Sequence, residues 1–171
     1  MNAEELKTIQ TPIKQKYKED PAKARITLRA DGVLGGQKIS CKLESGKAAV
    51  EAGLHPATGG DGSFVCSGDL LLESLVACFG VTLKAVATAM GLSIRQGRIQ
   101  AEGDLDFRGT LGIEKDVPVG FTQIRLAVHL DTGEPAEKIA KLLAVAERYC
   151  VVFQTLKSPP KIEMKLAENF S

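Results

Sequence analysis

The chain has no excess of charge of either sign. Its 171 residues include 22 lysines and arginines against 21 aspartates and glutamates, which leaves a formal net charge of +1. Proteins that bind nucleic acids or anionic membranes use clustered basic side chains, and no long block of one sign occurs here. The charge distribution therefore gives no support to nucleic acid or anionic membranes as partners, and it favours small-molecule chemistry.

Cysteine is scarce and irregularly spaced. Four cysteines, Cys41, Cys66, Cys78 and Cys150, do not make the disulfide framework of a small secreted scaffold. Residues 1–10 contain acidic side chains and lack the apolar core of a secretory signal, so we expect a cytoplasmic protein. In that reducing compartment the cysteines should rest as thiols, and any disulfide should be transient.

Motifs for nucleotides and metals are also lacking. The sequence contains no GxGxxG or GxxxxGK[ST] fingerprint, which removes the sequence support for nucleotide binding. It contains no CxxC, HxxxH or HExxH, and His55 and His129 stand apart from the cysteines. We therefore expect neither a bound cofactor nor a metal site.

The longest apolar run spans residues 70–90. Its length approaches that of a bilayer span, but Asp69 beside it and Lys84 within it argue against a membrane. We expect a core helix with Ser67 as its N-cap and Gly91 as its C-terminal stop. Because its apolar residues point nearly all round, this helix should be buried on most sides.

Alternating apolar and polar residues predict two antiparallel hairpins. The first covers residues 25–43 and turns at a Gly-Gly pair. The second covers residues 98–130 and turns within residues 109–112. A last strand is expected over residues 161–166, which follow two prolines.

Helix signals frame these strands. Residues 1–20 should form a helical lead-in of two short helices, the first capped by Asn2 and Glu5 and the second starting at Pro12. Residues 135–150 should form a second long helix, because a proline opens a stretch with apolar residues at helical spacing.

The order of these elements predicts an α+β fold. Strands, a long helix, strands, a helix and a last strand favour segregated antiparallel hairpins over a doubly wound parallel sheet. With 44% hydrophobic residues, the chain is long enough for one real core. We expect a single domain over residues 1–171, with the hairpins packed around the long central helix and the second helix.

Cys78 and Cys150 are the candidate reactive residues. Cys78 lies in the middle of the apolar run, where a cysteine usually packs as a small apolar side chain and burial raises its pKa. Cys150 falls at a helix break, near the start of a further helical turn whose dipole favours a thiolate, and Arg148 is close in sequence. From local sequence alone, a packing role stays open for both.

The other candidates have simpler explanations. Cys41 alternates with apolar strand residues and is expected in the core. Cys66 directly precedes the long helix, and no partner residue at a characteristic spacing marks it as reactive. Asp104, Asp106 and Arg108 alternate along one strand, which is typical of a solvated or salt-bridged face.

A family resemblance is carried by the stretches around the two candidate cysteines. These stretches are GLHPATGGDG, CSGD, SGDLLLESLVACFGVTL, EGDLDFRGTLG and ERYCVVFQTL. In these motifs and in the order of elements, residues 25–166 resemble the OsmC/Ohr family of thiol-dependent organic hydroperoxide reductases, and especially its OsmC-like branch.

The resemblance implies a chemistry for the two cysteines. Cys78 would attack an organic hydroperoxide as a thiolate and become a sulfenic acid, and Cys150 would resolve it as an intramolecular disulfide. A dithiol of the dihydrolipoamide type would then act as the reducing co-substrate. The resemblance also implies an intertwined homodimer with apolar cysteine pockets and a role in oxidative or osmotic stress protection.

The chain departs from the family's peroxidases at three places. Gln37 stands where they have an activating arginine, and Gly68 stands where they have the glutamate that holds it. Val151 follows Cys150, where proline is common. Two alternatives to a peroxidase therefore stay open: an apolar small-molecule binding protein, and a redox-responsive stress protein without efficient catalysis.

Overall fold

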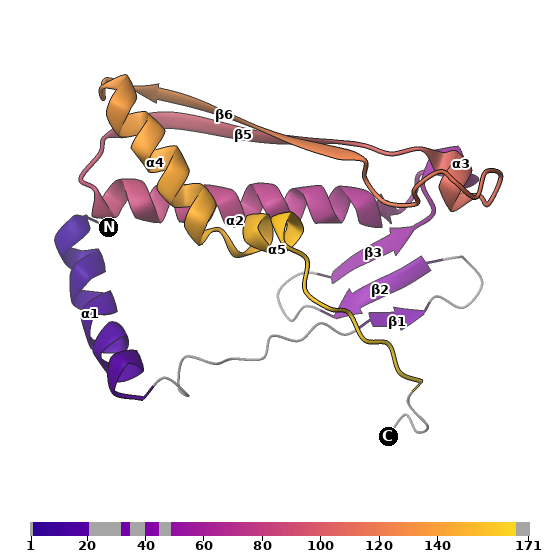
Figure 1. Ribbon diagram of the computed structural model, residues 1–171, viewed down its shortest axis with the longest axis horizontal. Coiled ribbons are helices and arrows are strands. Elements are labelled where there is room, and N and C mark those ends of the chain that lie inside the picture. Colours follow the sequence, from indigo (N-terminus) through magenta and orange to yellow (C-terminus); the bar gives the residue numbers. More distant parts are fainter. Residues whose placement is uncertain (1, 21–31, 35–39, 45–48, 167–171) are drawn as a thin grey trace.

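The computed structural model describes residues 2–20, 32–34, 40–44 and 49–166. Five helices and six strands are arranged as in Figure 1 within this part of the chain. In chain order they are α1 (Ala3–Glu19), β1 (Gly32–Leu34), β2 (Ser40–Glu44), β3 (Ala49–Gly53), β4 (Val65–Cys66), α2 (Ser67–Ala89), β5 (Ile94–Asp104), α3 (Phe107–Thr110), β6 (Gln123–Thr132), α4 (Ala136–Tyr149) and α5 (Val151–Lys157), with a 3₁₀ turn at Pro56–Thr58.

The small sheet contains β1, β2, β3 and β4 in that order, and only its β3–β4 pair is parallel. Val33 of β1 lies opposite Lys42 of β2 in antiparallel register. The predicted first hairpin is therefore confirmed where it is described. Its first half, residues 25–31, and its turn at residues 35–39 lie outside the described residues.

The second hairpin is a long ribbon that runs beside α2 (Figure 1). β5 and β6 pair antiparallel, with Ile99 opposite Val128, as predicted. β5 begins at Ile94 rather than at residue 98, and β6 ends at Thr132 rather than at residue 130. The turn also differs, because Asp106 accepts the backbone N–H of Arg108 at 3.0 Å and caps the short helix α3 inside the connection.

The lead-in is one helix rather than two. Asn2 and Glu5 form the predicted capping box, in which each side chain accepts the other's backbone N–H. The second start at Pro12 is wrong, because Thr11 donates its hydroxyl to the carbonyl of Lys7 at 2.7 Å instead of capping a new helix. Pro12 therefore lies within α1, which contacts α2 (Figure 1).

α2 is the central helix, and one stripe of it is buried in this chain. Its N-cap is Cys66 rather than the predicted Ser67, whereas Gly91 ends it with φ +67°, as predicted. The buried residues recur every four positions, and they are Leu75, Phe79, Leu83 and Ala87.

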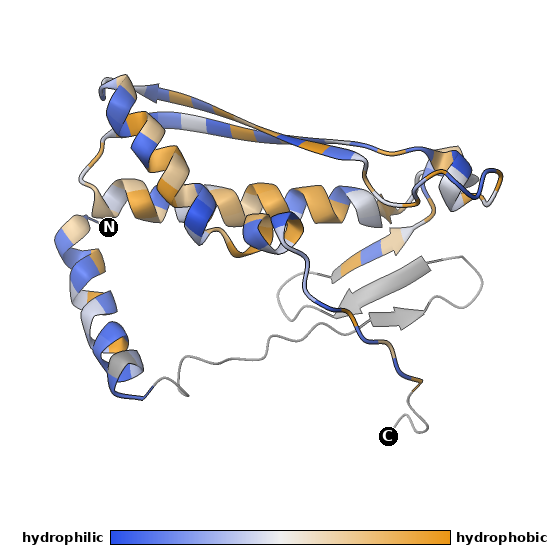
Figure 2. Cartoon of the chain, viewed as in Figure 1, coloured by the Kyte–Doolittle hydropathy of each residue, from blue (hydrophilic) through white to orange (hydrophobic). Residues whose placement is uncertain are grey.

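The prediction that α2 is buried on most sides is wrong for the chain by itself. Hydrophobic residues run along its whole length in Figure 2, but Val81 is 73% exposed. The reason is that α4, α5 and β5 cover one stripe of the helix and leave the opposite side open. Within the described residues, α2 is also the one helix long and apolar enough to cross a membrane by length and composition, and its buried stripe packs against α4, α5 and β5.

The core lies between α2 and α4. Leu142, Ala146 and Cys150 of the α4 segment are fully buried and meet Phe79 and Leu83 of α2. Pro135 is the N-cap of α4, which confirms the predicted start of the second long helix. This architecture confirms the α+β class, with hairpins packed around a long helix and a second helix.

The predicted last strand is absent from the described part of the chain. Residues 159–166 have no regular structure, and Ile162, Met164 and Leu166 are 88%, 95% and 94% exposed. A strand needs a neighbour for its backbone hydrogen bonds and its apolar face, and no described strand pairs with this segment.

Candidate functional site

The fold brings Cys78 and Cys150 together. Cys78 stands in the middle of α2, and Cys150 stands at the junction between α4 and α5, which both pack on α2. The two sulfurs are hydrogen-bonded to each other, and both residues are free thiols. Cys150 is fully buried and Cys78 partly buried, so the pair lies at the edge of the core.

A single residue separates α4 from α5. Cys150 has extended backbone angles (φ −76°, ψ 110°); its N–H closes the last turn of α4 on Ala146, and its carbonyl accepts the N–H of Gln154 in α5. The first N–H groups of a helix have no partner inside that helix. The N–H groups of Val151 and Val152 are therefore available, and both donate to the Cys78 sulfur.

The pKa of the Cys78 thiol lies below its ordinary value. Burial acts to raise it, but the backbone N–H groups of Val152 and Val151 and the Cys150 thiol together outweigh burial because they stabilise the thiolate. Thr82 contributes least to this lowering of the pKa. Its hydroxyl already donates its one proton to the Cys78 carbonyl at 2.8 Å.

The pKa of the Cys150 thiol is shifted the other way. Burial raises it most and the neighbouring Cys78 sulfur raises it further, whereas the backbone N–H groups of Phe153 and Val152 lower it. The helix break is where the sequence predicted it, and the N–H groups that follow it favour a thiolate at Cys150, as expected. Burial and the Cys78 sulfur outweigh them, so the net shift of the Cys150 pKa is upward.

Arginine and glutamate do not provide this activation within the described residues. Gln37 lies outside them, as do Arg25 and Arg29. Gly68 starts α2 ten residues before Cys78, which is about 15 Å along a helix, so the first turn of α2 cannot reach the sulfur. Arg148, which is close to Cys150 in sequence, lies over the ring of Tyr149 instead.

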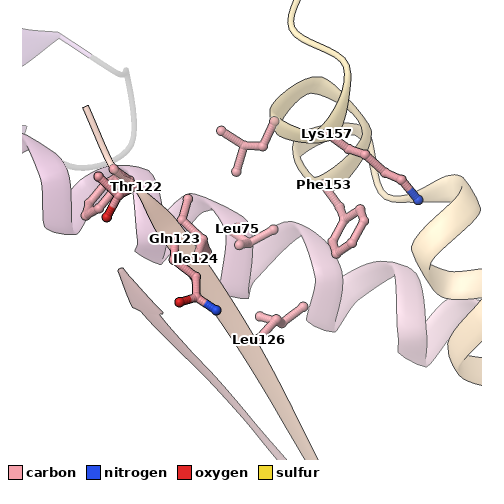
Figure 3. A pocket seen from close by; sticks show the side chains of 9 residues that line it. Leu75, Thr122, Gln123, Ile124, Leu126, Phe153 and Lys157 are labelled. Carbon is pink, nitrogen blue, oxygen red and sulfur yellow. The ribbon is translucent and has the colours of Figure 1, made fainter. Parts of the chain in front are cut away.

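An apolar cavity of about 450 Å³ is lined by side chains of α2, β6 and α5 (Figure 3). Among them are Leu75, three residues before Cys78 on α2, and Phe153, three residues after Cys150 on α5. Thr122, Gln123 and Lys157 supply the polar part of the lining, and Phe121, Ile124, Leu126 and Leu156 complete it. A cavity of this size and chemistry suits a small apolar molecule.

The other candidate residues lie elsewhere. Cys66 and His55 line a second cavity of about 400 Å³ at the start of α2, where the His55 ring stacks on Phe107 with centroids 4.8 Å apart. His129 is exposed on β6, and the described side chains include no group of three possible metal ligands. The backbone of Cys41 pairs within the small sheet, opposite Ala52.

The charged residues near α3 form exposed ion pairs. Asp104 pairs with Arg125 across the β5–β6 ribbon, and Asp106 pairs with Arg108. These pairs confirm the predicted salt bridging, but the shared strand face is wrong, because β5 ends at Asp104 while Asp106 is the N-cap of α3 and Arg108 lies within α3.

Two functional groups were missed by the sequence analysis, namely the backbone N–H groups of Val151 and Val152. The predicted helix break at Cys150 was a signal for free N–H groups at this point. The sequence could not indicate which sulfur they face.

Comparisons with known proteins agree with this fold. A sequence model of the family described as OsmC-like protein matches residues 60–165, more than half of the chain. An OsmC-like protein from Mycoplasma pneumoniae superposes with a TM-score of 0.65 at 18% identity, over 78% of this chain and 89% of its own. No curated protein sequence matches.

Two further solved structures with the same fold have names that mention hydroperoxides. The organic hydroperoxide resistance protein OsmC from Legionella pneumophila has a TM-score of 0.60 at 21% identity, over 78% of this chain and 90% of its own. The organic hydroperoxide resistance protein OhrB of Bacillus subtilis has a TM-score of 0.52 at 20% identity, over 78% and 93%. The match of the family model over more than half of the sequence shows that this chain belongs to the OsmC-like protein family.

Proposed function

We propose that the protein is a thiol peroxidase that reduces organic hydroperoxides through Cys78 and Cys150. The observation that carries the proposal is the hydrogen-bonded thiol pair with opposite pKa shifts, lowered at Cys78 and raised at Cys150. A peroxidase of this type needs one sulfur as the thiolate nucleophile and a second as a protonated thiol within reach. Among the described residues no arginine contributes to the lowered pKa of Cys78, so the proposal assigns this activation to the backbone N–H groups and the second thiol.

In the first step the Cys78 thiolate attacks the terminal oxygen of the hydroperoxide. The S–O bond forms as the O–O bond breaks, the sulfur is oxidised, and the alkoxide takes a proton and leaves as the alcohol. The N–H groups of Val151 and Val152 raise the thiolate fraction available for this attack. The apolar cavity accommodates the organic group of the substrate.

In the second step Cys150 attacks the sulfenic sulfur of Cys78. The S–S bond forms, the S–O bond breaks, and the departing hydroxide takes the Cys150 proton and leaves as water. An external dithiol of the dihydrolipoamide type then reduces the disulfide by two exchange steps and is itself oxidised to a cyclic disulfide. No bound cofactor takes part.

The test is consumption of cumene hydroperoxide by the reduced protein with dihydrolipoamide. We expect turnover by the wild type, none by Cys78→Ser, and a single stoichiometric event in Cys150→Ser that leaves a sulfenic acid for dimedone to trap. Cys66→Ser is the matched control, because Cys66 is a partly buried free cysteine of the second cavity, and it should retain full turnover. A folded wild type with free thiols that consumes no hydroperoxide would contradict the proposal.

A second candidate, an apolar small-molecule binding protein, is favoured by the size of the cavity and its apolar lining. It predicts saturable binding of a fatty ligand that is unaffected by Cys78→Ser and accompanied by no turnover. Slow, stoichiometric disulfide formation without turnover would instead indicate a redox-responsive stress protein.

We also propose that the protein is a homodimer, as the family resemblance implies. The open side of α2 around Val81 and the exposed apolar residues Ile162, Met164 and Leu166 support this proposal. Exposed apolar side chains that gather in one region mark interaction sites of soluble proteins. A symmetric pairing of two chains would cover both regions at once.

A further inference from the structure

The described side-chain polar contacts between α4 and α5 involve a single residue of α4, and the apolar side of α5 packs on α2 through Phe153 and Phe79. The last carbonyl groups of a helix lack partners inside it. One of these, the Glu147 carbonyl, accepts the side-chain N–H of Gln154 at 2.9 Å, across the break at Cys150. The Glu147 carboxylate pairs with Lys157 at a distance of 2.8 Å between Oε1 and Nζ.

These two contacts differ in strength. The bond from Gln154 is partly buried, so water competes for it poorly. The ion pair of Lys157 is exposed on both sides, and exposed pairs contribute little. α5 has seven residues, too few to stay ordered without tertiary contacts. The Gln154 amide is therefore the main polar contact that sets the angle between α4 and α5.

We propose that Gln154 is a positioning residue for the Cys78 sulfur. By bonding the Glu147 carbonyl it holds α5 at the angle that points the N–H groups of Val151 and Val152 at that sulfur. Its effect on thiolate formation follows from this geometry alone, whereas its effect on turnover rests on the proposed peroxidase function.

The surroundings of Cys78 leave few other groups to control its ionisation. Cys150 is the one ionisable side chain that bonds its sulfur in the described part of the chain. On the packed elements, Glu147 and Lys157 pair with each other. Lys84 on α2 and Arg98 on β5 are exposed. A change in α5 angle should therefore appear directly in the reactivity of Cys78.

The experiment measures the rate of Cys78 alkylation by iodoacetamide from about pH 5 to about pH 10, with Cys78 followed by peptide mass mapping. Gln154→Met keeps the side-chain length and removes the donor, and Gln154→Ala is measured in parallel in case one variant does not fold. The matched controls on α5 are Thr155→Ala and Thr155→Ser, at an exposed position next to Gln154.

We expect the Gln154 variants to shift the alkylation profile of Cys78 to higher pH and to lower the alkylation rate at pH values below its midpoint about tenfold. Both controls should keep the wild-type profile. Folded Gln154 variants with a wild-type profile would overturn the proposal, as would an equal shift in Thr155→Ala.

Hydroperoxide turnover is measured on the same proteins. A parallel tenfold fall in kcat/KM would extend the positioning role to the peroxidase reaction. A wild type without turnover would refute the proposed function, while the alkylation profiles would still decide the role of Gln154.

Discussion

Replacing Leu142 by alanine tests the packing of α4 on α2, on which the position of Cys150 depends. Leu142 is 0% exposed and belongs to the core cluster with Phe79, Leu83 and Ala146. The substitution removes about three methylene equivalents at about 0.8 kcal/mol each. A cavity term of about 24 cal/mol per Å³ adds up to about 2 kcal/mol. The two terms add to as much as about 4.4 kcal/mol, and buried Leu→Ala changes cost about 2.7–5.0 kcal/mol, so the expected loss in the free energy of unfolding is about 3–5 kcal/mol.

A loss of this size is easy to measure. For a chain of this length each kcal/mol corresponds to about 2–4 °C, so the thermal midpoint should fall by about 6–20 °C. The assay is guanidinium and thermal unfolding followed by circular dichroism, at one protein concentration for all variants.

Two controls separate the loss of packing from other effects. Leu142→Met conserves volume and should lose less than about 1.5 kcal/mol. Leu111→Ala makes the same chemical change at a side chain that is 51% exposed after α3, and it should lose less than about 1 kcal/mol. A Leu142→Ala protein within about 1 kcal/mol of the wild type would refute the packing of α4 on α2 described here.

Two further predictions concern the thiol pair and the assembly. Because the pKa of Cys78 is lowered, the midpoint of its alkylation profile should lie at lower pH in the folded protein than in guanidinium, where it should be about 8.5. An equal midpoint in folded and denatured protein would contradict the hydrogen bonds to the Cys78 sulfur. Cys150, with a raised pKa, should react only at higher pH than Cys78. Light scattering should give a dimer for the wild type and for Ile113→Asp, and a single-chain mass for Val81→Asp. Ile113 is the matched control because it is 69% exposed and Val81 is 73% exposed. A monomeric wild type would exclude the dimer, and equal masses for both variants would exclude α2 as its interface.

Local signals predicted much of the fold. The capping box of Asn2 and Glu5, the left-handed stop at Gly91 and the proline that opens α4 are all present, because each depends on a few neighbouring residues and their backbone angles. The apolar spacing of α4 likewise identified the face that carries Leu142, since a helical period places those side chains together whatever the rest of the chain does.

Signals that depend on a distant partner were less reliable. Pro12 was compatible with either a helix start or a position inside one, and the side chain of Thr11 decided between them. Residues 161–166 alternate like a strand but have no described strand beside them. Burial all round α2 also failed, because apolar composition says which side chains can be buried but not how many sides one chain can cover.

The same division holds for the site. The sequence by itself singled out Cys78 and Cys150 and located the helix break beside the second. Only the tertiary structure decided which sulfur has the lower pKa, because a pKa depends on burial and on donors within hydrogen-bond reach. The N–H groups of Val151 and Val152 reach Cys78 only after α5 has folded onto the middle of α2.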